Sequence, residues 1–298
     1  MSGSGPTVFG LFTNQTAAQA AYEELRYGSS QDLAKQVYLT SFYNRKETSL
    51  HNLKTDYVDI YQFHNPAVCP KPGDGSGLYE AMLEAKEQGK IRFIGITNHR
   101  MSIAEEAIES GLYDTLQFPF NYLSTEREIA LAKACAEHEM GFIAMKGLSG
   151  GLLTNSAAIY AYMAQFENVL PIWGVQKESE LDEFLSYIGN PPELTDELKA
   201  VIEKDQKELA GEFCRGCGYC MPCPAGIEIN NCARMSLLLR RSPSAGHLSP
   251  EGQAKMKKIE DCLHCGHCKS MCPYGLDTPK LLEENYKDYK EVLAGKSL

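Results

Sequence analysis

The residues with the most distinctive chemistry are eight cysteines near the C-terminal end of the chain. They form two runs: Cys214, Cys217, Cys220 and Cys223 followed by Pro224, and Cys262, Cys265, Cys268 and Cys272 followed by Pro273. The second run has the C-x2-C-x2-C-x3-C-P spacing, in which three thiolates bind one 4Fe-4S cluster and the fourth binds a neighbouring cluster. Soft sulfur ligands prefer iron and zinc over hard cations. The runs therefore predict two 4Fe-4S clusters and one-electron transfer.

The first run has two residues, instead of three, before its last cysteine. By the crossed arrangement of two-cluster ferredoxins, one cluster is expected on Cys214, Cys217, Cys220 and Cys272. The other cluster is expected on Cys262, Cys265, Cys268 and Cys223. Cys232 is a reserve ligand or, alternatively, a small buried residue on the apolar side of a helix over Ile229–Leu239. Cys69 and Cys135 have no partners at metal-binding spacing, so both are interpreted as structural.

Two other uses of these cysteines are weaker. A zinc ribbon needs only paired C-x2-C units, whereas each run has additional cysteines and a terminal C-P pair. Disulfides between cysteines so close in sequence form poorly, and they persist mainly in oxidising compartments. Zinc remains the main alternative to iron.

Length and charge limit the class of protein. The chain has 298 residues, one tryptophan and a formal net charge of −10, which favours two domains and argues against nucleic acid as a partner. No apolar run is long enough to span a membrane, and no signal peptide is recognised, so we expect a soluble, cytoplasmic protein without a membrane partner. The opening residues 1–5 resemble a flexible linker and are excluded from the fold prediction.

Short apolar segments alternate with helical patterns over residues 37–190. Strands are expected at Val37–Thr40, Tyr57–Phe63, Ile91–Ile96, Thr115–Phe118, Gly141–Met145 and Val169–Trp173. This alternation predicts an α/β fold with a parallel sheet. Regular βα units without a glycine-rich dinucleotide fingerprint favour a barrel over a doubly wound sheet. Capping boxes are expected at Ser102–Glu105 and Thr125–Glu128.

The domain boundary is expected just after the Pro191-Pro192 pair. A helix is predicted over Leu194–Leu209, and the cysteine runs follow directly. This places a barrel domain at residues 6–192 and an iron-sulfur domain at residues 193–298. The long spacing between the two runs favours a helical type of ferredoxin domain.

Several segments resemble the aldo/keto reductase family. The matching strand ends are Asp56–Pro66, Gly89–Asn98, Gln117–Tyr122 and Met145–Gly151. The cysteine runs are similar to the branch of that family that carries a fused two-cluster ferredoxin domain. The resemblance spans residues 27–290 and implies a parallel (β/α) barrel that binds NADP or NAD, followed by a C-terminal helical ferredoxin-like domain.

The resemblance also implies roles for individual residues. His64 and Tyr27 match the catalytic positions, while Thr97, Asn98 and Gln117 match positions that hold the nicotinamide carboxamide. Residues of the loops after the last two strands are expected to contact the nucleotide, and these are Lys146, Gly147, Gly174, Lys177 and Ser179. Without the resemblance, His64 would be interpreted as a bridge between loops, and Asn98 as a cap of the following helix.

The N-terminal part departs from the family pattern. Fewer residues precede Val37 than in the family, so the barrel is expected to be shortened by one strand. Tyr22 stands where the family has a catalytic aspartate, and Phe42 stands where it has a lysine. Because Tyr27 then lacks the ammonium that would help it to release a proton, ordinary carbonyl reduction is expected to be slow or absent.

Together these features predict an iron-sulfur oxidoreductase of the aldo/keto reductase type. It would couple a nicotinamide or other two-electron partner to one-electron transfer through two 4Fe-4S clusters. The alternative is an electron-transfer or redox-partner-binding protein whose barrel has lost catalysis. In either case a redox protein such as a ferredoxin or flavodoxin is an expected partner.

Overall fold

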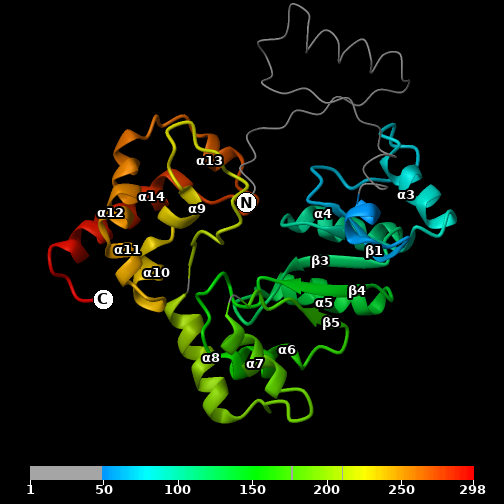
Figure 1. The fold of residues 1–298 in the computed structure, drawn as a ribbon, viewed down its shortest axis with the longest axis horizontal. Helices are drawn as coiled ribbons and strands as arrows, with labels where there is room; N and C mark the ends of the chain where they lie inside the picture. Colours follow the sequence, from blue (N-terminus) through cyan, green and yellow to red (C-terminus); the bar gives the residue numbers. More distant parts are fainter. Residues whose placement is uncertain (1–48, 176, 210) are drawn as a thin grey trace, which may run out of the picture. The chain divides into compact units, whose positions relative to one another are not determined.

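The computed structural model describes residues 49–175, 177–209 and 211–298 (Figure 1). The chain divides into two units, one ending at Gly95 and the other beginning at Ile96, so the division falls within strand β2. The expected strand at Val37–Thr40 lies outside the described residues. So do Tyr27, Tyr22 and Phe42, whose expected roles stay predictions.

Five strands alternate with helices in the described part of the N-terminal two thirds. In chain order the elements are β1 (Val58–His64), α3 (Leu78–Glu87), β2 (Ile91–Thr97), α4 (Met101–Ser110), β3 (Thr115–Pro119), α5 (Glu126–Glu137), β4 (Gly141–Met145), α6 (Ser156–Met163), β5 (Val169–Pro171) and α7 (Glu178–Ser186). The strands form one sheet in the order β1-β2-β3-β4-β5, and β4 pairs in parallel with both β3 and β5. These strands confirm the predicted α/β fold with a parallel sheet. The order is that of a (β/α) barrel, while closure into a barrel stays a prediction.

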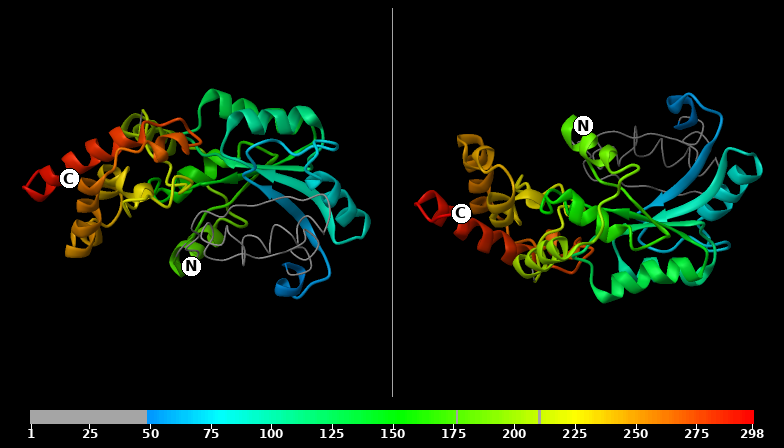
Figure 2. Two further views of the ribbon diagram at one scale, coloured as in Figure 1. Left: turned by 90° about the horizontal axis from the view of Figure 1, so that it is seen from above. Right: turned by 90° about the horizontal axis from the view of Figure 1, so that it is seen from below.

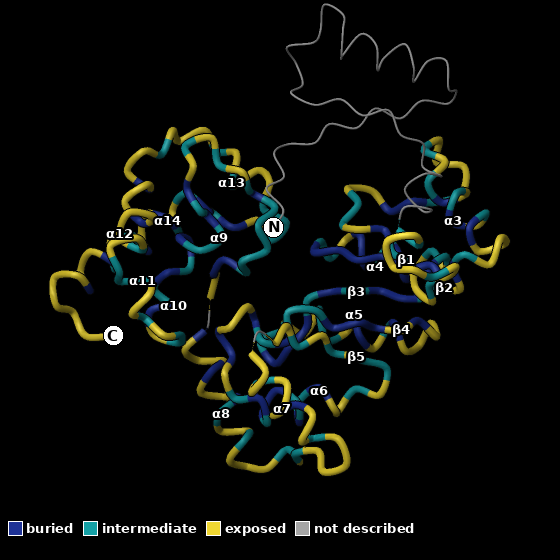
Figure 3. The backbone as a smooth tube through the Cα atoms, in the orientation of Figure 1, coloured by how far each residue is buried: buried dark blue, intermediate teal, exposed yellow. Residues whose placement is uncertain are grey.

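The core of the second unit forms around β3 and β4. Leu116, Phe118, Phe142 and Ala144 are all almost completely inaccessible to solvent. Helix α5 packs on β4, and α4 packs on β3 and α5. The green helix α5 runs alongside the strands (Figure 2), and β3 is buried along most of its length (Figure 3). Burial by flanking helices explains why these strands read as nearly continuous apolar runs.

The two expected capping boxes have different outcomes. At the start of α5 the Thr125 hydroxyl accepts a hydrogen bond from the Glu128 backbone, and Glu128 accepts one from the Thr125 backbone, as predicted. The expected box at Ser102 is wrong because α4 already begins at Met101. The side chain of Asn98 instead accepts the backbone N–H groups of His99 and Arg100, both at 2.9 Å.

Residues 193–298 are helical in their described part, with no strand among them. The helices are α8 (Asp196–Glu208), α9 (Ile229–Cys232), α10 (Met235–Arg241), α11 (Ala245–Leu248), α12 (Pro250–Lys257), the 3-10 helix η2 (Lys258–Asp261), α13 (His267–Ser270) and α14 (Thr278–Leu293). This confirms the expected C-terminal helical region and the helix predicted over Leu194–Leu209. Across the described residues, no helix combines the length and apolar character that crossing a membrane requires.

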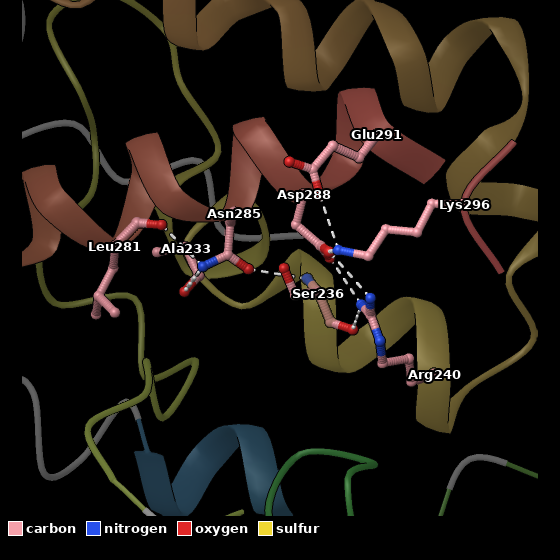
Figure 4. A network of polar contacts seen from close by, with 8 residues as sticks. All are labelled: Ala233, Ser236, Arg240, Leu281, Asn285, Asp288, Glu291 and Lys296. Carbon is pink, nitrogen blue, oxygen red and sulfur yellow. Dashed lines mark hydrogen bonds and ion pairs between the residues drawn. The ribbon is translucent and has the colours of Figure 1, made fainter. Parts of the chain in front are cut away.

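The single helix expected over Ile229–Leu239 is wrong, because the chain breaks between α9 and α10. Asn285 of α14 satisfies the backbone groups that this break frees (Figure 4). Its amide nitrogen donates to the carbonyls of Ala233 at 3.1 Å and Leu281 at 2.8 Å, and its oxygen accepts the Ser236 N–H at 2.8 Å. A side chain distant in sequence therefore replaces the local helical hydrogen bonds.

An ion pair on the next turn fastens α10 to α14. Arg240 reaches both oxygens of Asp288 at 2.7 and 2.9 Å, and Lys296 contacts the same carboxylate at 2.8 Å (Figure 4). The hydrogen bond from Arg240 is the largest cause that holds the pKa of Asp288 well below its usual range. Bidentate geometry makes this pair stronger than an ordinary surface pair.

A second arginine fastens α10 to α8 and to the loop after β4. Arg241 donates to Asp205 at 2.8 Å and to the Leu152 carbonyl at 3.0 Å. Asp205 also accepts a hydrogen bond from the Tyr122 hydroxyl. The side chains of Arg241 and Asp205 are each only 12% exposed. The hydrogen bonds of this buried ion pair to Leu152 and Tyr122 thus tie the iron-sulfur part to the loops at the strand ends.

Replacing Asp205 by alanine is expected to lower the free energy of unfolding by about 1–3 kcal/mol, because the buried Tyr122 hydroxyl loses its acceptor and Arg241 keeps only its more exposed partner Glu208. The matched control is Asp196→Ala on the same helix, whose exposed pair with Lys199 should be worth about 0–1 kcal/mol. Anaerobic urea denaturation followed by circular dichroism measures both. Equal losses in the two variants would contradict a stabilising role for the buried pair.

Candidate functional site

Four cysteines from both runs lie close together and are called the first cysteine group. They are Cys214, Cys217, Cys220 and Cys272. Burial raises the pKa of the Cys214 thiol, and the nearby thiols of Cys217 and Cys272 raise it further. Burial also raises the pKa of Cys220 to about 12, with additional contributions from Cys214, Cys217 and Cys268, so the two cysteine groups adjoin at Cys220. Cys272 of the second run thus lies beside cysteines of the first run. This is the grouping that the crossed assignment expects.

The other four cysteines line a common cavity. Cys223, Cys262, Cys265 and Cys268 all border it, together with apolar neighbours such as Leu282. Burial raises the pKa of the Cys268 thiol, and the Cys262 and Cys223 thiols raise it further. Among the eight cysteines of the two runs, Cys265 alone is exposed. The second group is therefore nearer to solvent than the first, in which Cys214 and Cys220 are buried.

The donor sets fit iron-sulfur clusters. Each group offers four thiols, and the backbone N–H of Gly216 donates to the sulfur of Cys214 at 3.4 Å, which is the kind of contact that tunes a cluster. Among the described residues, no three His, Cys, Asp or Glu side chains are arranged to hold a metal ion, so the fit rests on the type and number of the donors.

Two further cysteines lie outside both groups. Burial raises the pKa of both Cys232 and Cys135 to about 12. The sulfur of Cys232 lies 3.9 Å from the Lys255 carbonyl, and the sulfur of Cys135 lies 3.7 Å from that of Met140. These surroundings favour the structural interpretation of both residues.

Three residues expected to bind nicotinamide meet at the carboxyl ends of β2 and β3. The backbone N–H of Asn98 donates to the Gln117 carbonyl at 3.1 Å, which sets the two residues side by side. Thr97 and Asn98 are buried, and Asn98 is 0% exposed. The side-chain oxygen of Asn98 holds the segment before α4, but α4 itself has no side-chain cap, so the capping role considered above is wrong.

The expected nucleotide-contacting loops follow β4 and β5. Lys146 and Gly147 come directly after β4, and the Lys146 carbonyl accepts a hydrogen bond from the Asn121 amide at 2.9 Å. Gly147 packs closely against Trp173, since a Cβ atom there would lie 3.1 Å from the indole ring. Because β3, β4 and β5 are parallel, these loops share a sheet edge with Gln117.

The remaining residues of this set lie at and before the start of α7. Gly174 adopts a φ of 70°, a conformation that favours glycine. Lys177 and Ser179 are exposed, and the Lys177 N–H donates to Glu180 at 3.3 Å. An exposed lysine at a helix start suits a phosphate contact, which stays a prediction.

His64 is the last residue of β1 and is exposed. It belongs to the first unit, whereas the residues at the β3 and β4 ends belong to the second. Its catalytic role, like that of Tyr27, stays a prediction.

The structure adds three aromatic residues that the sequence interpretation missed. The Nδ1 atom of His99 lies 2.5 Å from the Tyr274 hydroxyl, and its ring packs edge-on against Tyr219 and Tyr274 at centroid distances of 5.0 and 5.7 Å. Tyr219 lies between Cys217 and Cys220, and Tyr274 lies two residues after Cys272. His99 directly follows Asn98, so it joins the β2 end to both cysteine runs. A tyrosine within or directly beside each cysteine run was the available signal.

Cations of the second unit also surround this junction. Burial raises the pKa of the Cys217 thiol, while the charge of Lys146 lowers it, so the ammonium lies near the first cysteine group. A small cavity beside it is lined by Asn121, Lys146, Arg215 and Tyr274, among others. The loop after β4 and the first cysteine group therefore share one polar environment.

Two family profiles match separate segments of the chain. The aldo/keto reductase family profile matches residues 28–167, and the 4Fe-4S dicluster domain profile matches residues 213–277. A profile described as GHMP kinases C terminal matches residues 1–29, which lie outside the described part of the chain.

Individual relatives match only part of the chain. Methylglyoxal reductase DkgB of Salmonella typhimurium is 34% identical over 120 residues, which cover 37% of this chain and 43% of the relative. The probable glycolate oxidase iron-sulfur subunit of Bacillus subtilis is 29% identical over 98 residues, covering 28% of this chain and 22% of that protein. The chain spans about a third to about half of the length of the reductases it matches.

Among solved structures, the apo form of aldo-keto reductase AKR11C1 from Bacillus halodurans has a TM-score of 0.47 and 20% sequence identity, covering 57% of this chain and 69% of that one. The two family profiles match separate segments, and the second segment contains all eight cysteines of the two runs. The chain therefore carries an aldo/keto reductase family domain followed by a C-terminal 4Fe-4S dicluster domain.

Proposed function

We propose that this chain is an oxidoreductase in which a nicotinamide nucleotide at the ends of β2, β3 and β4 exchanges electrons with two 4Fe-4S clusters. The observation that carries the proposal is the position of His99. It adjoins Asn98 at the expected carboxamide site, and its ring contacts Tyr219 and Tyr274 from the two cysteine runs. A continuous path of packed side chains thus connects the expected nucleotide site with the first cysteine group.

The electron count fits this arrangement. When bound, the two clusters take up or release one electron each, which together match the two electrons of one hydride. Oxidation of a reduced nicotinamide then releases one proton, which passes to solvent. Within this chain, Gln117 holds the carboxamide. Packed side chains fill the path between the two sites, and electron transfer is faster through packed atoms than through empty space.

The relatives support nicotinamide as the two-electron partner. They include proteins named methylglyoxal reductase, and one relative in Escherichia coli is named NADH-specific methylglyoxal reductase. Paired donor and acceptor groups such as those of Gln117 suit a carboxamide. Both NADPH and NADH are therefore appropriate probes.

A second candidate function is electron transfer without nucleotide chemistry, with the barrel serving as a scaffold. It is favoured by the Asn98 side chain, whose oxygen accepts two backbone N–H groups and so is less available to a carboxamide. Cys265 is exposed beside Leu263, which is 65% exposed, so a one-electron carrier such as a ferredoxin or flavodoxin could approach the second cluster. Nucleotide binding distinguishes the two candidates.

Anaerobically prepared protein is expected to contain about eight iron atoms per chain and a broad visible absorption that bleaches with dithionite, because each cysteine group provides four thiolates. Iron and zinc analysis together with the absorption spectrum measure this. Stoichiometric zinc without iron after anaerobic reconstitution would favour the zinc alternative and contradict the proposal.

Replacing Gln117 by alanine is expected to weaken nucleotide binding by about 1–3 kcal/mol, because it leaves part of a buried carboxamide without a hydrogen-bond partner. Anaerobic calorimetry with NADPH and NADH measures the affinity. Gln165→Ala, an exposed change in the same domain, is the control and should bind like the original chain. No binding of either nucleotide by the original chain at millimolar concentration would favour the scaffold candidate.

Replacing His99 by phenylalanine is expected to slow electron exchange between nucleotide and clusters by about tenfold or more, equivalent to about 1.4 kcal/mol in activation free energy. The variant keeps an aromatic ring but loses the hydrogen bond to Tyr274. Anaerobic stopped-flow absorption measures the rate, and iron content and nucleotide affinity should not change. His138→Phe, at an exposed site, is the control. An unchanged rate in His99→Phe would show that electrons do not pass by this route.

A further inference from the structure

Arg234 occupies the break between two helices of the iron-sulfur part. Helix α9 ends at Cys232, and α10 begins at Met235, so Arg234 is the N-cap residue of α10, with φ −137° and ψ 18°. Its Nη1 atom donates to the carbonyl of Gly150, in the loop after β4, at 3.3 Å. A residue of the iron-sulfur part thus contacts a loop that is expected to bind nucleotide.

Two glycines leave the space that the guanidinium fills. A Cβ atom on Gly150 would lie 2.7 Å from Nη1 of Arg234, and a Cβ atom on Gly216 would lie 2.8 Å from its Cζ. Both distances are shorter than real contacts between such atoms. Gly216 lies between Cys214 and Cys217, so the guanidinium rests directly against the loop that carries two ligands of the first cysteine group.

The Nε atom of Arg234 is buried and has no hydrogen-bond partner among the described residues. An unpaired buried donor on a charged group is costly, and such a group calls for an acceptor. The charges of Arg234 and Cys214 interact, so the first cysteine group is the neighbouring acceptor. Sulfur atoms of a bound cluster accept N–H donors of this kind.

We propose that Arg234 is a positioning residue for the first cluster and raises its reduction potential. This rests on the clusters of the proposed function, with the first held by Cys214, Cys217, Cys220 and Cys272. Reduction adds one negative charge to a cluster, and a fixed cation in contact with it stabilises the reduced form more than the oxidised form. Burial lowers the reduction potential, because it disfavours the added negative charge. The positive charge of Arg234 offsets this effect of burial.

The test is an anaerobic redox titration with chemical mediators and without nucleotide, followed by electron paramagnetic resonance. In Arg234→Gln, the ratio of reduced to oxidised first cluster at a fixed potential should fall by about tenfold, equivalent to about 59 mV for a one-electron couple. The second cluster should keep its midpoint. Arg234→Lys, which retains a cation, should recover most of the shift.

The matched control is Arg240→Gln on the same helix. Its guanidinium pairs with Asp288 instead of the cysteine loop (Figure 4), so both midpoints should stay as in the original chain. If Arg234→Gln loses iron, Gly150→Ala is titrated instead, because its Cβ would meet Nη1 at 2.7 Å, and the strain of an alanine at a φ of 67° falls on the loop after β4. It should also lower the first midpoint.

The proposal would be overturned if the first midpoint were unchanged in Arg234→Gln with full iron content. The same holds for Gly150→Ala where that variant is used instead. Arg234 would then be a purely structural link. An original chain without iron would instead overturn the proposed function. Because the titration uses no nucleotide, its result is independent of whether the barrel binds one.

Discussion

The buried ion pair between Arg241 and Asp205 fixes the geometry on which the site depends. Arg241 belongs to the iron-sulfur part, and it also donates to the Leu152 carbonyl in the segment after β4. Asp205 in turn accepts from Tyr122, which follows the end of β3. Burying two charges away from water is unfavourable unless they pair with good geometry. The buried positions of Arg241 and Asp205 are therefore stable only while the two side chains stay in contact. That arrangement brings the strand ends of the second unit to the cysteine loops.

Around this junction, three contacts between the barrel part and the iron-sulfur part involve residues with an expected chemical role. His99 reaches both cysteine runs through Tyr219 and Tyr274, and Arg234 reaches from the first cysteine loop to Gly150. The ammonium of Lys146 acts on the Cys217 thiol. A loop expected to contact nucleotide phosphates is thus also in electrostatic contact with the first cysteine group. Changes in charge at either place should therefore be felt at the other.

The sequence was sufficient to predict the features that depend on residues close together in the chain. Cysteine spacing predicted the 4Fe-4S dicluster domain that the family profile matches, and apolar runs predicted strands β1 to β5 within a few residues. The failures arose where a distant residue decides the local structure. The helix expected over Ile229–Leu239 breaks because Asn285, 49 residues beyond Ser236, provides alternative hydrogen bonds. His99 and Tyr274 are separated by 175 positions, so no local pattern reveals their contact.

The measurement that most directly tests the coupling of nucleotide and clusters is an anaerobic exchange of electrons in both directions. Oxidised protein is mixed with NADPH or NADH, and dithionite-reduced protein, freed of excess dithionite, is mixed with NADP or NAD. Cluster absorption and nicotinamide absorption are followed together. In the energetically downhill direction, one nicotinamide should react for every two cluster electrons. Intact clusters that exchange no electrons in either direction would contradict it.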